Sequence, residues 1–168
     1  MKPTFMREQS KPDMAGKVDP DIRASESREV HPQISEASPA AQATIRVLYG
    51  DTDAMGQAYY GNYLKWFEVG RAEWFRSRGM TYRELEGGGI FLPVVEAHCS
   101  YHKPAFYDDI LIISTRFRFV GPIRLRFEYE IRRDPLTLAS GYTVHVCVNR
   151  DRKVLKPPHY LKALLTKE

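Results

Sequence analysis

Residues 123–132 alternate between apolar and charged side chains without interruption, and this pattern constrains the fold more than any other stretch. Every second residue is apolar: Ile123, Leu125, Phe127, Tyr129 and Ile131. The residues between them are charged: Arg124, Arg126, Glu128, Glu130 and Arg132. Successive side chains of a β-strand point to opposite faces of a sheet, so the pattern predicts a strand with one buried face and one solvated face.

Four further segments predict strands that extend this sheet. They comprise residues 44–49, 91–102, 110–120 and 139–149. Gly121-Pro122 and Asp134-Pro135 stand on either side of the alternating strand, which favours antiparallel neighbours joined by short turns. Residues 159–167 follow as a short terminal helix.

One long amphipathic helix is predicted between the first strand and the others, over about residues 61–78. Its apolar side chains recur at helical spacing and form a single stripe: Tyr63, Trp66, Phe67, Gly70, Trp74 and Phe75. Residues 80–89 follow as a short polar segment. A single helix stripe that packs on an antiparallel sheet makes an α+β domain, which is the predicted fold class.

Residues 1–42 differ from the rest in composition. They contain five of the eleven prolines, one aromatic residue, six Lys or Arg and seven Asp or Glu. Such a segment has too few apolar side chains to offset the entropy lost on ordering. We therefore predict a disordered tail over residues 1–42 and one domain over residues 43–168. The tail has no apolar stretch typical of a secretory signal, so we expect a cytoplasmic protein.

Composition argues against several other classes of protein. Among 168 residues there are two cysteines and no run of 18 apolar residues, so neither a disulfide scaffold nor a membrane span is expected. The net charge is +4, but no basic tract suits a nucleic acid. His98 and His102 would lie about 13 Å apart on a strand at roughly 3.3 Å per residue, too far to share a metal ion. Glu96 and His98 are weaker candidates for residues that face a cleft.

The stretch from Asp51 to Tyr63 carries the strongest functional signal. It places two carboxylates and two glycines directly before the apolar helix. The N-terminus of a helix leaves backbone N–H groups unpaired, and such groups can hold a developing oxyanion. A nearby carboxylate can act as a nucleophile or a general base. The plainer interpretation is a loop in which Asp and Gly serve only to form turns.

This stretch resembles the signature of the 4-hydroxybenzoyl-CoA thioesterase family of the hotdog fold, and it looks closest to the Tol–Pal-associated, YbgC-type acyl-CoA thioesterases. The matching positions of the motif are Asp51, Thr52, Asp53, Gly56, Tyr59, Asn62 and Tyr63. Further matches lie along the helix and after the second strand: Phe67, Glu68, Arg71, Trp74, Gly79, Tyr101, Lys103, Pro104, Ala105, Asp108 and Asp109. The resemblance covers about residues 44–158.

The resemblance implies a hotdog fold, in which a curved antiparallel sheet wraps around a long helix, and an active site between two subunits of a homodimer or homotetramer. It implies that Asp53 attacks the thioester carbonyl or activates water. It further implies that the backbone N–H of Tyr60 binds the oxyanion and that Gly56 permits the turn that aims Asp53. Tyr60 stands where many relatives have His, so any help from that His is absent here.

The resemblance also implies residues that bind substrate. Leu92, Pro93 and Val94 match the segment that lines the acyl pocket of the partner subunit. The turn that begins at Gly121 lacks the basic residue with which relatives hold a CoA phosphate. Arg124 is close enough to substitute for it, or is simply an exposed arginine of the sheet.

The leading hypothesis is an acyl-CoA thioesterase that needs neither cofactor nor metal, because a thioester is already activated. One alternative is a thioesterase that acts on acyl-carrier protein. Another is a non-catalytic hotdog domain that binds an acyl thioester. The carboxylate of Asp53 argues against a pure binding domain, since binding alone does not require it.

Overall fold

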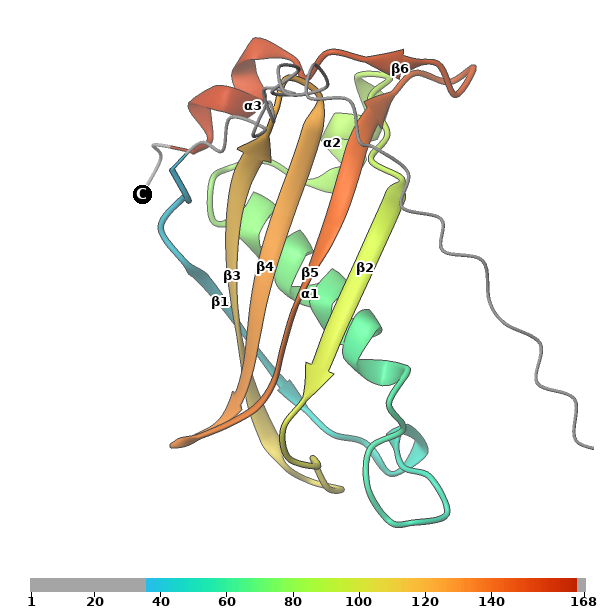
Figure 1. Cartoon of the computed structure of the whole chain (residues 1–168), viewed down its shortest axis with the longest axis vertical. Helices are drawn as coiled ribbons and strands as arrows, with labels where there is room; N and C mark the ends of the chain where they lie inside the picture. The colour runs from blue at the N-terminus through green and yellow to red at the C-terminus, as the bar shows by residue number, and fades with distance from the viewer. Residues whose placement is uncertain (1–35, 166–168) are drawn as a thin grey trace, which may run out of the picture. The chain divides into compact units, whose positions relative to one another are not determined.

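The computed structural model describes residues 36–165, which contain one antiparallel sheet and three α-helices (Figure 1). The strands are β1 (Ala41–Arg46), β2 (Val94–Tyr101), β3 (Ile110–Val120), β4 (Arg124–Arg133), β5 (Leu136–Val148) and β6 (Val154–Leu155). The helices are α1 (Asn62–Arg76), α2 (Tyr82–Gly87) and α3 (His159–Ala163), and a 3₁₀ turn spans Tyr49–Asp51. The α+β class predicted from the sequence is confirmed.

The strands lie side by side in the order β1-β3-β4-β5-β2, and β6 pairs with the end of β5. Every pairing is antiparallel, as the turns around β4 predict. The predicted bounds of β3 are confirmed, and those of β4 differ by one residue. The first strand was predicted too late, because β1 ends at Arg46 and residues 49–51 turn instead.

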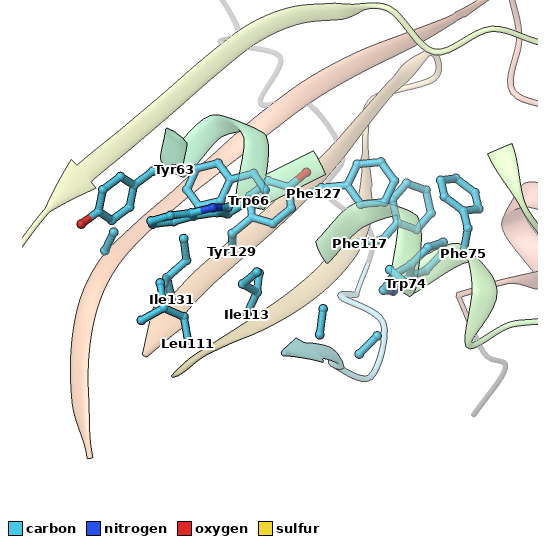
Figure 2. Packing of buried hydrophobic residues seen from close by; sticks show 14 of the residues in the cluster. Tyr63, Trp66, Trp74, Phe75, Leu111, Ile113, Phe117, Phe127, Tyr129 and Ile131 are labelled. Carbon is cyan, nitrogen blue, oxygen red and sulfur yellow. The ribbon is translucent and has the colours of Figure 1, made fainter. Parts of the chain in front are cut away.

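Helix α1 crosses one face of the sheet and contributes five aromatic side chains to the core: Tyr63, Trp66, Phe67, Trp74 and Phe75 (Figure 1). Trp74 and Phe75 from the helix are fully buried and meet Phe117 and Phe127 from the sheet (Figure 2). Burying each such ring contributes about 1.5–3 kcal/mol. A Cβ on Gly70 would lie 2.5 Å from Thr115 Oγ1, so only glycine allows the helix to come this close to β3.

The packed domain begins earlier than residue 43. Ser38 is buried, and its hydroxyl oxygen accepts hydrogen bonds from Trp74 Nε1 at 2.9 Å and from the Phe117 N–H at 3.0 Å. The carbonyl oxygen of Pro39 accepts from Arg78 at 2.7 Å. The predicted boundary is therefore wrong for residues 36–42, because hydrogen bonds rather than apolar bulk attach this segment. The remainder of the predicted tail, residues 1–35, lies outside the described residues.

Helix α2 occupies part of the segment predicted only as polar. Thr81 caps it, since its side chain accepts from the Glu84 N–H while the Glu84 carboxylate accepts from the Thr81 N–H. This reciprocal pair is a capping box, and the spacing Thr-x-x-Glu in the sequence is its signal. At the other end of the chain, α3 begins at His159 as predicted and ends earlier, at Ala163.

Candidate active site

The loop between the 3₁₀ turn and α1 holds Asp53 at its centre. Asp53 is half-buried, and one carboxylate oxygen accepts a hydrogen bond from the Met55 N–H at 2.8 Å. Its second carboxylate oxygen meets no donor in residues 36–165. The loop closes on itself because the Asp53 N–H donates to Gln57 at 2.8 Å and the Gly56 N–H donates to Asp53 at 2.9 Å. Gly56 has φ +74°, a left-handed conformation that suits glycine and permits this turn.

The backbone of Tyr60 presents a free N–H directly before α1. The preceding carbonyl, of Tyr59, accepts from the Asn62 N–H at 2.9 Å and so fixes the orientation of that peptide plane. The N–H of Tyr60 in the same plane has no partner in the described part of the chain. The carbonyl of Tyr60 accepts from the Tyr63 N–H at 3.3 Å and from the Tyr101 hydroxyl at 3.1 Å. The free N–H is available as a donor to an anionic oxygen.

Asp51 has a structural role in the 3₁₀ turn. It is 8% exposed, and its carboxylate accepts from the Leu48 N–H at 2.9 Å. Lys65 Nζ lies 3.9 Å from the other carboxylate oxygen. Because the side chain of Lys65 is mostly exposed, this ion pair contributes little to stability. The carboxylate of Asp51 therefore stabilises the 3₁₀ turn instead of facing a ligand.

A cleft of about 220 Å³ opens beside Tyr60. Its walls consist of Gln57, Ala58, Tyr60, Tyr63, Tyr101, His102, Lys103 and Pro104. The Tyr63 and Tyr101 rings meet edge to face, with centroids 5.0 Å apart. Burial is the largest cause that raises the pKa of Tyr101 to about 12, so this phenol is protonated at neutral pH and serves as a donor, not a base. Tyr101 is part of the family pattern in the sequence, but that pattern does not predict the contact between its ring and that of Tyr63.

The other predicted site residues lie at the opposite end of the sheet. Val94 pairs with His145 and Arg124 with Val146, whereas Tyr101 pairs with Ala139 near the Asp53 end. The strand from residue 94 to residue 101 is about 23 Å long at roughly 3.3 Å per residue. One chain therefore does not bring Asp53 together with the predicted acyl-binding segment or with Arg124.

A larger cavity of about 650 Å³ occupies this second end. Its walls consist of Tyr82, Glu86, Phe91, Leu92, Pro93, Val148, Asn149, Arg150 and Arg152. Leu92 and Pro93 thus line a cavity, whereas Val94 lies outside it and is 50% exposed. Arg124 is exposed on β4 and is not part of the cavity wall.

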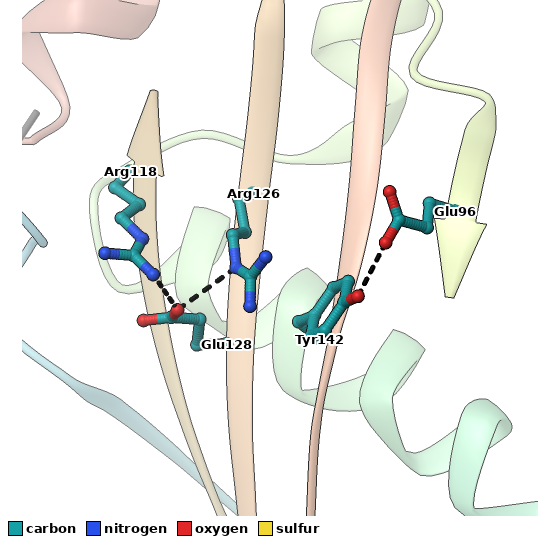
Figure 3. Close-up of polar contacts among 5 residues, drawn as sticks. All are labelled: Glu96, Arg118, Arg126, Glu128 and Tyr142. Carbon is teal, nitrogen blue, oxygen red and sulfur yellow. Dashed lines mark hydrogen bonds and ion pairs between the residues drawn. The ribbon is translucent and has the colours of Figure 1, made fainter. Parts of the chain in front are cut away.

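The outer face of the sheet, away from α1, carries a chain of polar contacts (Figure 3). The Arg126 guanidinium stacks over the Tyr142 ring at 3.6 Å, and the Tyr142 hydroxyl donates to Glu96 at 2.5 Å. Glu128 pairs with both Arg118 and Arg126. Glu96 is therefore engaged with Tyr142 on the outer face of the sheet. The ring of His98 stacks on Tyr142 on the same face.

Neither cysteine is an activated nucleophile, and residues 36–165 contain no cluster of metal ligands. Burial raises the pKa of Cys147 to about 11 and also raises that of Cys99, so both thiols stay protonated. Burial is the largest cause that lowers the pKa of His145 to about 4, so this ring is neutral. Within the described range, no group of three or more His, Cys, Asp or Glu is placed to hold a metal ion. Among the same residues, no helix is long and apolar enough to cross a membrane.

Comparison with known proteins identifies the family. The model of the thioesterase-like superfamily matches residues 47–165. The chain belongs to this superfamily. The acyl-CoA thioester hydrolase YbgC of Escherichia coli is 30% identical over 122 residues, which cover 72% of this chain and 90% of that protein. The acyl-CoA thioesterase YbgC of Haemophilus influenzae is 31% identical over 119 residues, which cover 70% and 86%.

Solved structures agree with this assignment. The DHNA-CoA thioesterase of Staphylococcus aureus matches with a TM-score of 0.69 at 29% identity, covering 74% of this chain and 85% of that chain. A 4-hydroxybenzoyl-CoA thioesterase shares the fold with a TM-score of 0.69 at 20% identity, covering 76% and 99%. The predicted hotdog fold is confirmed, and this member of the thioesterase-like superfamily is a thioester hydrolase. The names of its relatives support acyl-CoA thioesterase activity.

Proposed function

We propose that this protein hydrolyses acyl-CoA or aroyl-CoA thioesters to the free acid and CoA, with Asp53 as the catalytic carboxylate. The observation that carries the proposal is that two groups without hydrogen-bond partners occur in one short loop. One carboxylate oxygen of Asp53 and the N–H of Tyr60 both lack partners in residues 36–165, while hydrogen bonds from the N–H groups of Gly56, Ala58 and Tyr59 hold the loop around them. A carboxylate and a fixed N–H donor are the two groups that thioester hydrolysis needs.

The chemistry takes one of two forms. Asp53 attacks the thioester carbonyl, the C–S bond breaks, the CoA thiolate leaves, and water then hydrolyses the acyl-aspartyl anhydride. Alternatively, Asp53 takes a proton from water while the water oxygen attacks the same carbonyl; the C–S bond then breaks, the CoA thiolate leaves and takes up that proton, and the free acid remains. In both forms the Tyr60 N–H stabilises the negative oxygen of the tetrahedral intermediate, and Gly56 keeps Asp53 in its turn.

An assay with short-chain, long-chain and aromatic acyl-CoAs tests this function. We expect release of free thiol by the wild type with at least one class. Asp53→Asn is nearly isosteric and removes the nucleophile or base, so we expect its kcat to fall by about two or more powers of ten. A folded variant with unchanged kcat would refute the role of Asp53, and a wild type without activity on any class would refute the function.

We further propose that a second subunit completes the site. The segment from Leu92 to Val94 and Arg124 are too far from Asp53 in one chain, so they would serve the partner's Asp53 as acyl wall and phosphate contact. Strand β2 is an edge of the sheet, and Val94 and Val95 are 50% and 54% exposed. Unpaired edges of this kind favour pairing with another chain. Light scattering is expected to show a homodimer or homotetramer in the cytoplasmic enzyme, and an active monomer would refute the shared site.

A further inference from the structure

Asn62 belongs to the sequence motif, yet the proposed chemistry gives it no task. It is the first residue of α1, and its side-chain Nδ2 donates to the carbonyl oxygen of Asp51 at 2.7 Å, across eleven residues of chain. The same carbonyl oxygen accepts the Tyr59 N–H at 2.8 Å. The Asn62 side chain therefore joins the start of the helix to the start of the loop.

Asp53 and Tyr60, the two residues assigned to the reaction, lie within the loop that this hydrogen bond closes. Asp53 is two residues after Asp51, and Tyr60 is two residues before Asn62. Asp51 is a firm anchor, because it is 8% exposed and its carboxylate accepts the Leu48 N–H. The Asn62 contact and the Tyr59 N–H bond to the same carbonyl oxygen thus close the loop that carries the carboxylate and the N–H donor.

We propose that Asn62 is a positioning residue, which fixes the separation between the Asp53 carboxylate and the Tyr60 N–H by holding the Asp51 carbonyl. This inference rests on the proposed function and adds a role outside the reacting groups. An amide suits the task because it donates a hydrogen bond while remaining uncharged beside a catalytic carboxylate. Small errors in such positioning are costly, since a displacement of about 1 Å can reduce the rate on the order of 100-fold.

Asn62→Ala tests the proposal with benzoyl-CoA and decanoyl-CoA, using whichever the wild type hydrolyses faster. We expect kcat to fall about 10- to 100-fold while KM stays within about threefold, because the substrate-binding walls are intact. Ser77→Ala is the matched control. It removes a side-chain donor to a backbone carbonyl, that of Trp74 at 2.9 Å, at the far end of the same helix. Its kcat should equal that of the wild type.

Asn62→Asp provides a second readout that a purely structural role would not move. The ionised carboxylate cannot donate to the Asp51 carbonyl, whereas the protonated carboxyl group can. We expect the ratio of the variant's kcat to the wild type's kcat to rise as the pH falls from 8 to 5. A ratio that stays flat, or a folded Asn62→Ala variant with kcat within threefold of the wild type, would overturn the proposal.

The Asp53→Asn variant separates this inference from the proposed function. If Asp53→Asn is inactive and both Asn62 variants are fully active, the function stands and the positioning role is wrong. In the double variant Asp53→Asn/Asn62→Ala, we expect most of the Asn62 effect to vanish, because residues that act as a unit are not additive. Full additivity would contradict a role that acts through Asp53.

Discussion

The hydroxyl of Tyr101, at the last residue of β2, donates to the carbonyl oxygen of Tyr60 at 3.1 Å. This contact ties the edge strand to the peptide that follows the free N–H. Tyr101→Phe keeps the ring and removes the bond, worth about 1 kcal/mol, so we expect kcat to fall roughly fivefold. Tyr107→Phe, on an exposed ring, is the control and should keep its activity. Equal kcat for both variants would contradict a role for the Tyr101 hydroxyl.

The close contact between α1 and β3 predicts a cost for the smallest possible addition. Gly70→Ala would place a methyl group 2.5 Å from Thr115 Oγ1 and 2.7 Å from Ile113 Cγ2. We expect the free energy of unfolding to fall by about 1–3 kcal/mol despite the better helix propensity of Ala. Gly87→Ala, with open space around its Cβ, serves as the control and should not destabilise. Chemical denaturation measures both, and equal midpoints would contradict the packing argument.

Ser38 predicts that the segment before β1 contributes to stability. Ser38→Ala would leave two buried donors unpaired, Trp74 Nε1 and the Phe117 N–H. We expect a loss of about 2–4 kcal/mol in the free energy of unfolding, with kcat unchanged, because each buried unpaired donor costs about 1–3 kcal/mol. Ser114→Ala on the outer face is the control. An unchanged melting temperature for Ser38→Ala would show that the segment is dispensable.

His145 predicts a loss of stability in mild acid. Its ring is buried, hydrogen-bonded to Thr143 and to the Leu92 carbonyl, and its pKa is lowered to about 4, mainly by burial and secondly by the charge of Arg71. The unfolded chain therefore binds a proton below about pH 6.5 that the folded chain refuses until about pH 4. Stability should be full above pH 6.5 and should fall by up to about 3 kcal/mol toward pH 4.

Unfolding curves between pH 7 and 4 measure this dependence. Replacing the ring in His145→Gln should flatten part of the curve in that window, although the variant is less stable at pH 7. His159→Gln changes an exposed ring and should leave the slope as it is in the wild type. A steep slope that survives in His145→Gln would assign the acid sensitivity to other groups.

The sequence predicts best those features whose partners are near in the chain. The bounds of β4 follow to within one residue from the alternation of apolar and charged side chains, and those of β3 from an apolar segment that ends before Gly121-Pro122. Asp53, Gly56 and Tyr60 lie in one loop because only six residues separate the first from the last. Strand β1 was placed three residues late, since its inward side chains Ala41 and Ala43 are small and give little apolar signal.

Features that depend on distant partners could not be predicted in this way. The contact between Tyr101 and Tyr60 joins residues 41 positions apart, and nothing local to either reveals it. The role of Ser38 arises from two donors on other elements, although serine itself gives no core signal. The separation of Leu92 from Asp53 depends on the direction and length of β2. Helix α2 was also missed, although the local Thr81-x-x-Glu84 spacing is its signal in the sequence.

The length of β2 has a genetic consequence under the proposed arrangement. Each chain would contribute its Asp53 to one site and its Leu92–Val94 segment to the other, so a dimer would contain two sites, each of mixed parentage. A subunit defective at Asp53 and a subunit defective at Leu92 would both be inactive alone. When the two are mixed, one of the two sites in the heterodimer would combine an intact Asp53 from one subunit with an intact Leu92–Val94 segment from the other. Activity would therefore return by complementation between two defective alleles.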